Sequence, residues 1–308
     1  MPDLGGPRGG TLLSSSAVIV PLPPPARRDV GLGTAYERWA VYELLKKWLA
    51  PLGVATALEG PVDGMAGIPG LHLLPAAARG TRVTAIVPDA EGAEVVRGVY
   101  RTVGLQERLD VRVGTAWPDE TFDLVLTYNA LPSVPDWRSY LGEAARHAHR
   151  LLLVSVTHPT SYGVFVRRIL RLAQPGPKPL ELFDHPSTRP RELEPELLRH
   201  GRITEDAYVD CPWWPDLFVE TGQTLLTGTL SRLPFGSRFK RRPGAATPAA
   251  SGAEPFLYGP GRFPLLGGDG WSDELAPALK RHPNLDGGRF RRLSGLLAHH
   301  RVRAVARD

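Results

Sequence analysis

Short β-rich apolar runs alternate with segments of helical periodicity between residues 34 and 157, and this alternation limits the folds open to the chain. Strands that alternate with helices at this spacing predict a parallel sheet with right-handed crossovers. We predict strands over residues 53–58, 82–87, 109–113, 122–128 and 151–157. We predict helices over residues 34–50, 65–78, 91–103 and 136–148. The first of these helices opens at a capping box formed by Thr34 and Glu37, and prolines break the second into short pieces.

The last third of the chain returns to the same pattern. A short helix over 194–200, with Pro195 in its first turn, is predicted to precede a strand over 203–209. A helix over 290–298 leads to a strand over 301–306, which is predicted to join the sheet as its seventh strand. The predicted fold class is therefore α/β, with a Rossmann-like, doubly wound, mostly parallel seven-stranded sheet.

Proline and glycine mark the predicted boundaries of the domain. Residues 1–33 lack periodicity and are interpreted as a flexible arm. Residues 34–234 form the main domain, and 235–289 are a long Pro/Gly-rich insertion before the last strand. Residues 290–308 supply the closing helix and strand of the same domain.

Composition excludes several classes of protein. The single cysteine, Cys211, excludes an internal disulfide framework and a cysteine-rich zinc site. Acidic residues and histidines near 184–205 lack metal-ligand spacing, so no metal is predicted. The net charge of +5 comes from arginines spread along the chain, and this makes nucleic-acid binding unlikely as the main role. No apolar run reaches the roughly 20 residues that span a bilayer, and a cytoplasmic location is expected.

A glycine-rich turn follows the first predicted strand. The strand ends in Glu59, and Gly60, Asp63 and Gly64 follow within five residues. Glycine permits positive φ angles and lets backbone N–H groups approach a ligand closely. We therefore take these four residues as candidate ligand contacts.

Further short motifs follow in a fixed order, at residues 122–126, 131–136, 201–203, 210–213 and 299–307. Together with the glycine-rich turn they resemble class I S-adenosylmethionine-dependent methyltransferases, over residues 36–230 and 290–306. The turn departs from that family's pattern because it is one residue short and has Val62 where a glycine is usual.

The resemblance implies S-adenosylmethionine as cofactor and suggests where it binds. Asp89 follows the second strand and is a candidate for the ribose hydroxyls, or alternatively caps the next helix. Thr115 and Ala116 lie where the family holds the adenine, beside Trp117, which stacks on a ligand or simply packs. Tyr128 and Asn129 end the fourth strand, at the sheet edge where ligands bind in such folds. Asn129 contacts the cofactor or substrate, or alternatively is a turn residue.

Candidates for the acceptor side come after the fifth strand. His158 and Tyr162 are candidate catalytic residues, with His158 as a base because its ordinary pKa is near neutrality. The alternative for His158 is a loop histidine with structural hydrogen bonds. Trp213 and Trp214 are candidates for the wall of a substrate pocket, or alternatively seal the edge of the domain.

Two functions follow from these residues. The first is methyl transfer from S-adenosylmethionine to a small molecule, which needs in-line geometry in a dry cleft. The second is a degenerate methyltransferase fold that acts as a binding or scaffold subunit with a protein partner. The shortened turn and the lack of a carboxylate at the end of the second strand favour the second function.

Overall fold

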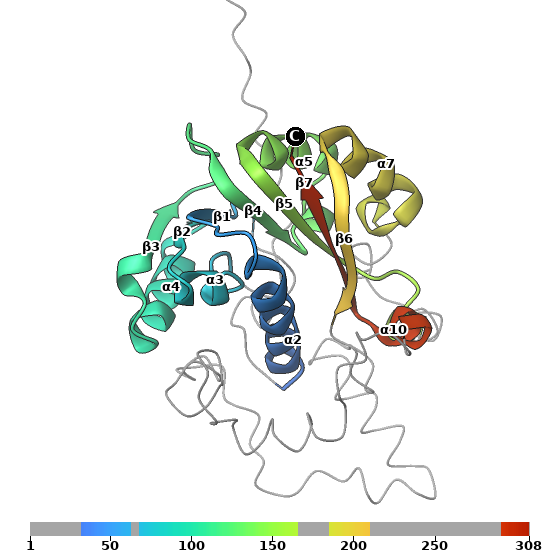
Figure 1. Cartoon of the computed structure of the whole chain (residues 1–308), viewed down its shortest axis with the longest axis horizontal. Coiled ribbons are helices and arrows are strands. Elements are labelled where there is room, and N and C mark those ends of the chain that lie inside the picture. Colours follow the sequence, from blue (N-terminus) through green and yellow to red (C-terminus); the bar gives the residue numbers. More distant parts are fainter. Residues whose placement is uncertain (1–31, 63–67, 166–184, 210–290, 308) are drawn as a thin grey trace, which may run out of the picture.

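A seven-stranded sheet forms the centre of the computed structural model, which describes residues 32–62, 68–165, 185–209 and 291–307 (Figure 1). The strand order is β3-β2-β1-β4-β5-β7-β6, and β7 runs antiparallel to both of its neighbours while the other pairs are parallel. The prediction of a doubly wound, mostly parallel seven-stranded sheet is confirmed. The strands are β1 (Thr56–Glu59), β2 (Arg82–Val87), β3 (Leu109–Val113), β4 (Phe122–Tyr128), β5 (Ala148–Thr157), β6 (Arg202–Val209) and β7 (His300–Ala306).

Helices cover both faces of this sheet (Figure 1). The first three described helices pack on one face, and the next two pack on the other. The six are α2 (Leu32–Leu49), α3 (Leu74–Ala78), α4 (Ala90–Thr102), α5 (Trp137–His147), α7 (Pro190–His200) and α10 (Arg291–Leu297). Single 3₁₀ turns lie at η1 (Gln106–Arg108), η2 (Leu131–Ser133) and η3 (Pro186–Thr188).

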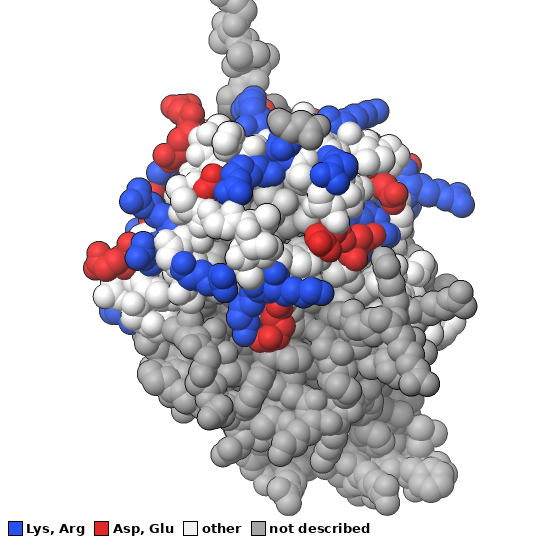
Figure 2. Space-filling model, in the orientation of Figure 1, with Lys and Arg blue, Asp and Glu red and all other residues white. Residues whose placement is uncertain are grey.

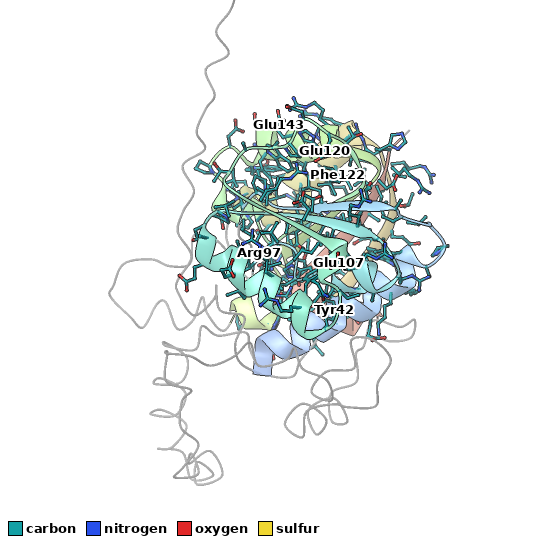
Figure 3. All side chains as sticks on the ribbon, turned by 90° about the vertical axis from the view of Figure 1, so that its left-hand side faces the viewer. Tyr42, Arg97, Glu107, Glu120, Phe122 and Glu143 are labelled. Carbon is teal, nitrogen blue, oxygen red and sulfur yellow. The ribbon has the colours of Figure 1, made fainter. Side chains whose placement is uncertain are left out.

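Two apolar cores result, one on each face of the sheet. Tyr42 of α2 belongs to the core under α2 and α4, whereas Phe122 of β4 belongs to the core under α5 and α7 (Figure 3). Strand β4 feeds both cores, because Leu124 and Leu126 face the first and Val125 faces the second. Burial on both faces explains why this strand reads as a continuous apolar run.

Aspartates fix the ends of three elements. Asp123 accepts hydrogen bonds at Oδ2 from the backbone N of Ala55 (2.7 Å) and of Thr56 (3.2 Å), and so attaches the start of β1 to β4. Asp136 caps α5 by accepting from the backbone N of Ser139 at 3.2 Å. Asp89 does the same for α4, as described below.

Several predicted boundaries are wrong. Helix α3 begins only at Leu74, because the described residues 68–73 before it form turns, and strand β5 begins at Ala148, before the predicted start at residue 151. Helix α2 begins at Leu32, so Thr34 lies inside the helix and does not open a capping box. Strand β1 begins only at Thr56, where its ladder to β2 starts. Helix α7 begins at Pro190, so Pro195 lies in its interior and not in its first turn. Prolines at both positions fit a helix start, and the sequence alone did not separate them.

Charged side chains are spread over the visible surface. Figure 2 shows Lys and Arg side chains across the described face with Asp and Glu side chains among them. Several of the acidic groups pair with arginines, such as Glu94 with Arg97 at 2.7 Å. Within the described ranges, no helix combines the length and the apolarity needed to cross a bilayer.

Candidate functional site

The carboxyl ends of β1 and β4 meet at the point where the strand order reverses. The chain proceeds outward from β1 through β2 to β3 on one side, and from β4 to β5 on the other. In doubly wound sheets, ligands bind in the crevice outside the strand ends at this switch point. Glu59 ends β1, and Asn129 directly follows β4, so two residues singled out from the sequence lie at this edge.

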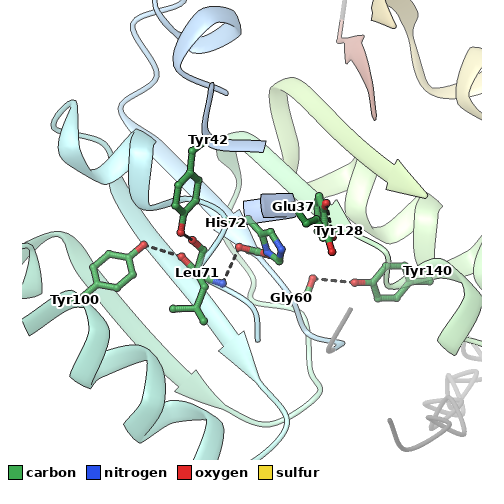
Figure 4. A network of polar contacts seen from close by, with 10 residues as sticks. Glu37, Tyr42, Gly60, Leu71, His72, Tyr100, Tyr128 and Tyr140 are labelled. Atoms are coloured by element: carbon green, nitrogen blue, oxygen red, sulfur yellow. Dashed lines mark hydrogen bonds and ion pairs between the residues drawn. The ribbon is translucent and has the colours of Figure 1, made fainter. Parts of the chain in front are cut away.

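The carboxylate of Glu59 is held by the chain itself. The side chain is buried, its Oε2 accepts a hydrogen bond from the backbone N of Gly70 at 2.7 Å, and its Oε1 accepts from Nδ1 of His72 (Figure 4). Both oxygens therefore serve to fold the segment after β1 back onto the strand. A ligand contact for Glu59 stays a prediction.

Three tyrosines anchor the ends of the glycine-rich segment. Tyr140 donates a hydrogen bond to the carbonyl of Gly60 at 3.0 Å, Tyr42 to that of Leu71 at 2.6 Å, and Tyr100 to that of Gly70 at 2.8 Å (Figure 4). Burial raises the pKa of Tyr100 and of Tyr140, so both hydroxyls keep the proton that they donate. The segment is thus fixed at both ends by helices α2, α4 and α5.

The start of the turn packs tightly against β2. Gly60 has φ +122°, and a Cβ built on it would lie 2.2 Å from the carbonyl oxygen of Ile86. Val62 is buried in the same apolar core as Ile86. The missing side chain of Gly60 is therefore needed for contact between backbones. Asp63 and Gly64 lie outside the described residues.

The residues predicted to contact the cofactor after β2 and β3 are more exposed to solvent than Glu59. Asp89 is the N-cap of α4, with Oδ1 accepting from the backbone N of Gly92 at 2.9 Å, which is the capping alternative raised above. Thr115 and Ala116 are exposed after β3. Trp117 packs, with its ring centroid 5.2 Å from that of Tyr140.

Asn129 stands out at the end of β4. It has φ +49°, its side chain is fully buried, and its backbone N donates to the carbonyl of Ser155 at 3.0 Å. Neither polar atom of its side-chain amide has a hydrogen-bond partner among the described residues. A buried amide without partners costs free energy, which a polar ligand at this position would recover.

His158 directly follows β5 at the same edge of the sheet, and its side chain lies between β5 and α10. Its Nε2 contacts the carbonyl oxygen of Gly295 at 2.6 Å and the hydroxyl of Thr160 at 2.8 Å. Burial lowers the pKa of His158. This geometry fits the alternative of a loop histidine with structural hydrogen bonds, and a role as base stays a prediction. Tyr162 is half-buried, with its ring 6.4 Å from that of His299.

The remaining candidates cannot be placed. Trp213, Trp214 and Cys211 lie outside the described residues, whereas of the acidic residues and histidines near 184–205 only Asp184 does. Within the described ranges, no three His, Cys, Asp or Glu side chains form a group that could hold a metal ion.

Sequence reasoning missed a second polar group under α2. The ring of His72 stacks on that of Tyr128 at 3.8 Å, and the Tyr128 hydroxyl donates to Oε1 of Glu37 at 2.7 Å (Figure 4). Nδ1 of His300 lies 3.5 Å from the same Glu37 oxygen. These residues are far apart in the sequence, and no spacing signal connects them.

We expect the folded chain to lose stability as the pH falls below about 6.5. Burial, followed by the charges of Arg38 and His300, lowers the pKa of His72 well below its ordinary 6.5. The unfolded chain then binds a proton at His72 that the folded chain excludes, so stability falls by up to about 1.4 kcal/mol per pH unit. Urea unfolding at pH 7.5, 6.5 and 5.5 measures this slope. His72→Gln should flatten it, and an equal slope in both proteins would contradict the assignment.

Comparison with known proteins gives one family match. Residues 65–150 match a family model described as a methyltransferase domain. The match begins after β1 and after Gly60, so it does not include the first residues of the turn. No curated protein matches the chain in sequence.

Solved structures give weak likenesses. Magnesium protoporphyrin IX methyltransferase from Synechocystis PCC 6803 is 14% identical, over 57% of this chain and 79% of that chain, with a TM-score of 0.44. A methyltransferase from Thermotoga maritima, described as a possible histamine N-methyltransferase, is 15% identical over 90% and 92% of the two chains, with a TM-score of 0.44. Both TM-scores are too low to carry an argument about function.

Proposed function

We propose that the chain is a class I methyltransferase that transfers a methyl group from S-adenosylmethionine to a small-molecule acceptor, because residues 65–150 match a methyltransferase domain and the sheet is doubly wound. The observation that carries the proposal is Asn129, whose buried amide has no partner among the described residues and lies beside the switch point of the sheet. Ligands of doubly wound sheets bind at that point.

The residues at this edge fit the cofactor in part. The amide of Asn129 offers both a donor and an acceptor, which suits the amino and carboxylate groups of the methionine part. The exposed hydroxyl of Thr115 is available for one hydrogen bond to the adenine. When bound, the cofactor supplies an electrophilic methyl group. The chain's own contribution is to hold the cofactor and the acceptor in line and to exclude water.

A second function has specific observations in its favour. Val62 is buried in the apolar core beside the turn, Asp89 caps a helix, and both oxygens of Glu59 have partners within the chain. These features suit a methyltransferase fold that has become a non-catalytic binding or scaffold subunit. Binding of the cofactor separates the two functions.

We expect the purified chain to bind S-adenosylmethionine and S-adenosylhomocysteine with micromolar dissociation constants in calorimetry. Asn129→Gly should weaken binding about tenfold, because it removes the amide and its hydrogen bonds. Glycine is the suitable replacement because it tolerates the positive φ of this position. A thermal shift provides a second measurement, since ligand at 100 times its dissociation constant stabilises by about 2.7 kcal/mol.

Thr121→Ala is the matched control for this experiment. Thr121 is exposed and precedes β4, at the opposite end of the strand from Asn129, so its replacement should leave binding unchanged. Absence of binding up to millimolar cofactor would overturn the proposed methyl transfer. The non-catalytic alternative would then be preferred.

A further inference from the structure

A group of polar side chains lies on the sheet face that α2 covers. Two come from α2, four from the carboxyl-terminal parts of β1, β4 and β5, one from the start of the antiparallel strand β7, and one from the segment before α3. We call this group the α2 cluster, and its members are Glu37, Arg38, Glu59, His72, Tyr128, Ser155, Thr157 and His300. Seven of the eight are buried, and Glu37 is nearly so, with 13% of its side chain exposed.

The strand members share one face because of the sheet register. Tyr128 pairs with Ser155 on the neighbouring strand, and Thr157 pairs with His300 on the next. Side chains two residues apart on a strand point to the same face. Ser155 and Thr157 therefore point to the same side as Leu153 of β5, which belongs to the core under α2.

His72 carries a buried acceptor atom. Its Nδ1 contacts a carboxylate oxygen of Glu59, which can only accept, so Nδ1 carries the proton and Nε2 keeps its lone pair. Nε2 is buried and has no hydrogen-bond partner among the described residues. Burial lowers the pKa of His72, so the ring is neutral at pH 7.

Two hydroxyls in the cluster, Oγ of Ser155 and Oγ1 of Thr157, are also buried without a hydrogen-bond partner among the described residues. Each buried polar atom left without a partner costs about 1–3 kcal/mol. Three such atoms in one buried group require an explanation, and a bound polar molecule supplies it.

The charged members define what that molecule can be. Arg38 carries one positive charge, and Glu37 and Glu59 are both carboxylates with partners in the cluster. A neutral ligand avoids the free-energy cost of adding another buried charge to this group. The lone pair on His72 requires a donor from it, and a hydroxyl can both donate to Nε2 and accept from Ser155 or Thr157.

We propose that the α2 cluster binds a small neutral molecule through a hydroxyl group that donates to Nε2 of His72 and contacts the hydroxyls of Ser155 and Thr157. Glu59 acts as the positioning residue that fixes the tautomer of His72. The identification of this molecule as the methyl acceptor rests on the proposed function. The binding of a hydroxyl compound at the α2 cluster does not depend on that function.

Two probes that differ only by a methyl group on the oxygen test the proposal without cofactor. 4-Methylphenol has the required hydroxyl, which stays protonated at pH 7 as in tyrosine, and 4-methylanisole is its methyl ether. The full chain should bind 4-methylphenol at least about tenfold more tightly than 4-methylanisole in calorimetry, because only the phenol can donate to Nε2. Equal binding of the two probes, or binding of neither, would overturn the proposal.

Variants assign the binding to the cluster. His72→Gln should remove the preference for the phenol, whereas His147→Gln should keep it. His147 is a matched control because it is also a buried histidine, but it lies on α5 in contact with Trp117. Retention of the preference in His72→Gln would show that the phenol binds elsewhere and would overturn the proposal.

A second pair of variants avoids any dependence on the folding of His72→Gln. Ser155→Ala and Thr157→Val remove hydroxyls that make no hydrogen bond within the described chain, so both proteins should fold. Each should weaken the binding of 4-methylphenol severalfold. Unchanged affinity in both would contradict the assigned contacts. Failure to bind S-adenosylmethionine would leave these results intact and would affect only the identity of the ligand as acceptor.

Discussion

Replacing Gly60 by alanine is expected to destabilise the folded chain by about 3 kcal/mol or more in urea unfolding. The φ angle of +122° is strained for any residue with a Cβ, and that atom would lie 2.2 Å from the carbonyl oxygen of Ile86. This carbonyl belongs to β2, which is paired on both sides by β1 and β3, so it cannot move without disturbing the ladder. Strain and steric overlap therefore add.

Gly80→Ala separates these two effects. Gly80 has φ +99°, but a Cβ there would meet no atom within 4 Å. Only the backbone strain remains, and about 1–2 kcal/mol is expected. If Gly60→Ala costs no more than Gly80→Ala, the close approach to β2 is not what requires glycine at position 60.

The result bears on how a glycine-rich turn is interpreted. In the sequence, Gly60 indicates a place where a ligand approaches bare backbone. In the structure, the atom that approaches is a carbonyl of the neighbouring strand. The same residue type satisfies both requirements, so glycine by itself does not distinguish a ligand site from tight packing of the chain.

Periodicity predicted the strands well where burial is two-sided. The bounds of β2, β3 and β4 agree with the prediction, because their apolar runs end where the ladders end. The sequence predicted that β1 starts at Gly53, whereas the strand starts at Thr56. The prediction was wrong because residues 53–55 continue directly into the apolar run of the strand, with no turn signal between them. Its true start depends on Asp123 from β4, a contact across 67 and 68 residues that no local pattern encodes.

Of the candidate site, the sequence predicted only the residues at the ends of the strands. Glu59 and Asn129 could be singled out because strand ends of a parallel sheet meet at one edge. The partners of Glu59 could not, because His72 reaches it through a segment whose path depends on three tyrosines from different helices. The α2 cluster could not be predicted from the sequence either, because it brings together residues as distant as Glu37 and His300 and no local pattern connects them.

Replacing Glu59 by leucine is expected to cost about 3 kcal/mol or more of stability. Leucine fills the space but leaves the backbone N–H of Gly70 and one ring nitrogen of His72 buried without their partner. Each loss costs about 1–3 kcal/mol. Glu59→Gln should cost less, because its amide oxygen still accepts from Gly70 while the His72 ring changes tautomer to accept from the amide NH₂.

Glu94→Leu is the control for removing an acidic side chain. Glu94 is exposed on α4 and pairs with Arg97 at 2.7 Å, so its replacement should change stability by no more than about 0.5 kcal/mol. If Glu59→Leu were as mild as this control, the carboxylate would not hold the turn, and a ligand contact would become its better explanation. If the large cost is observed, loss of cofactor binding in a Glu59 variant reports on folding as well as on contact. Asn129 is then the residue at which cofactor binding is tested without disturbing the fold, because its side chain makes no hydrogen bond within the described chain.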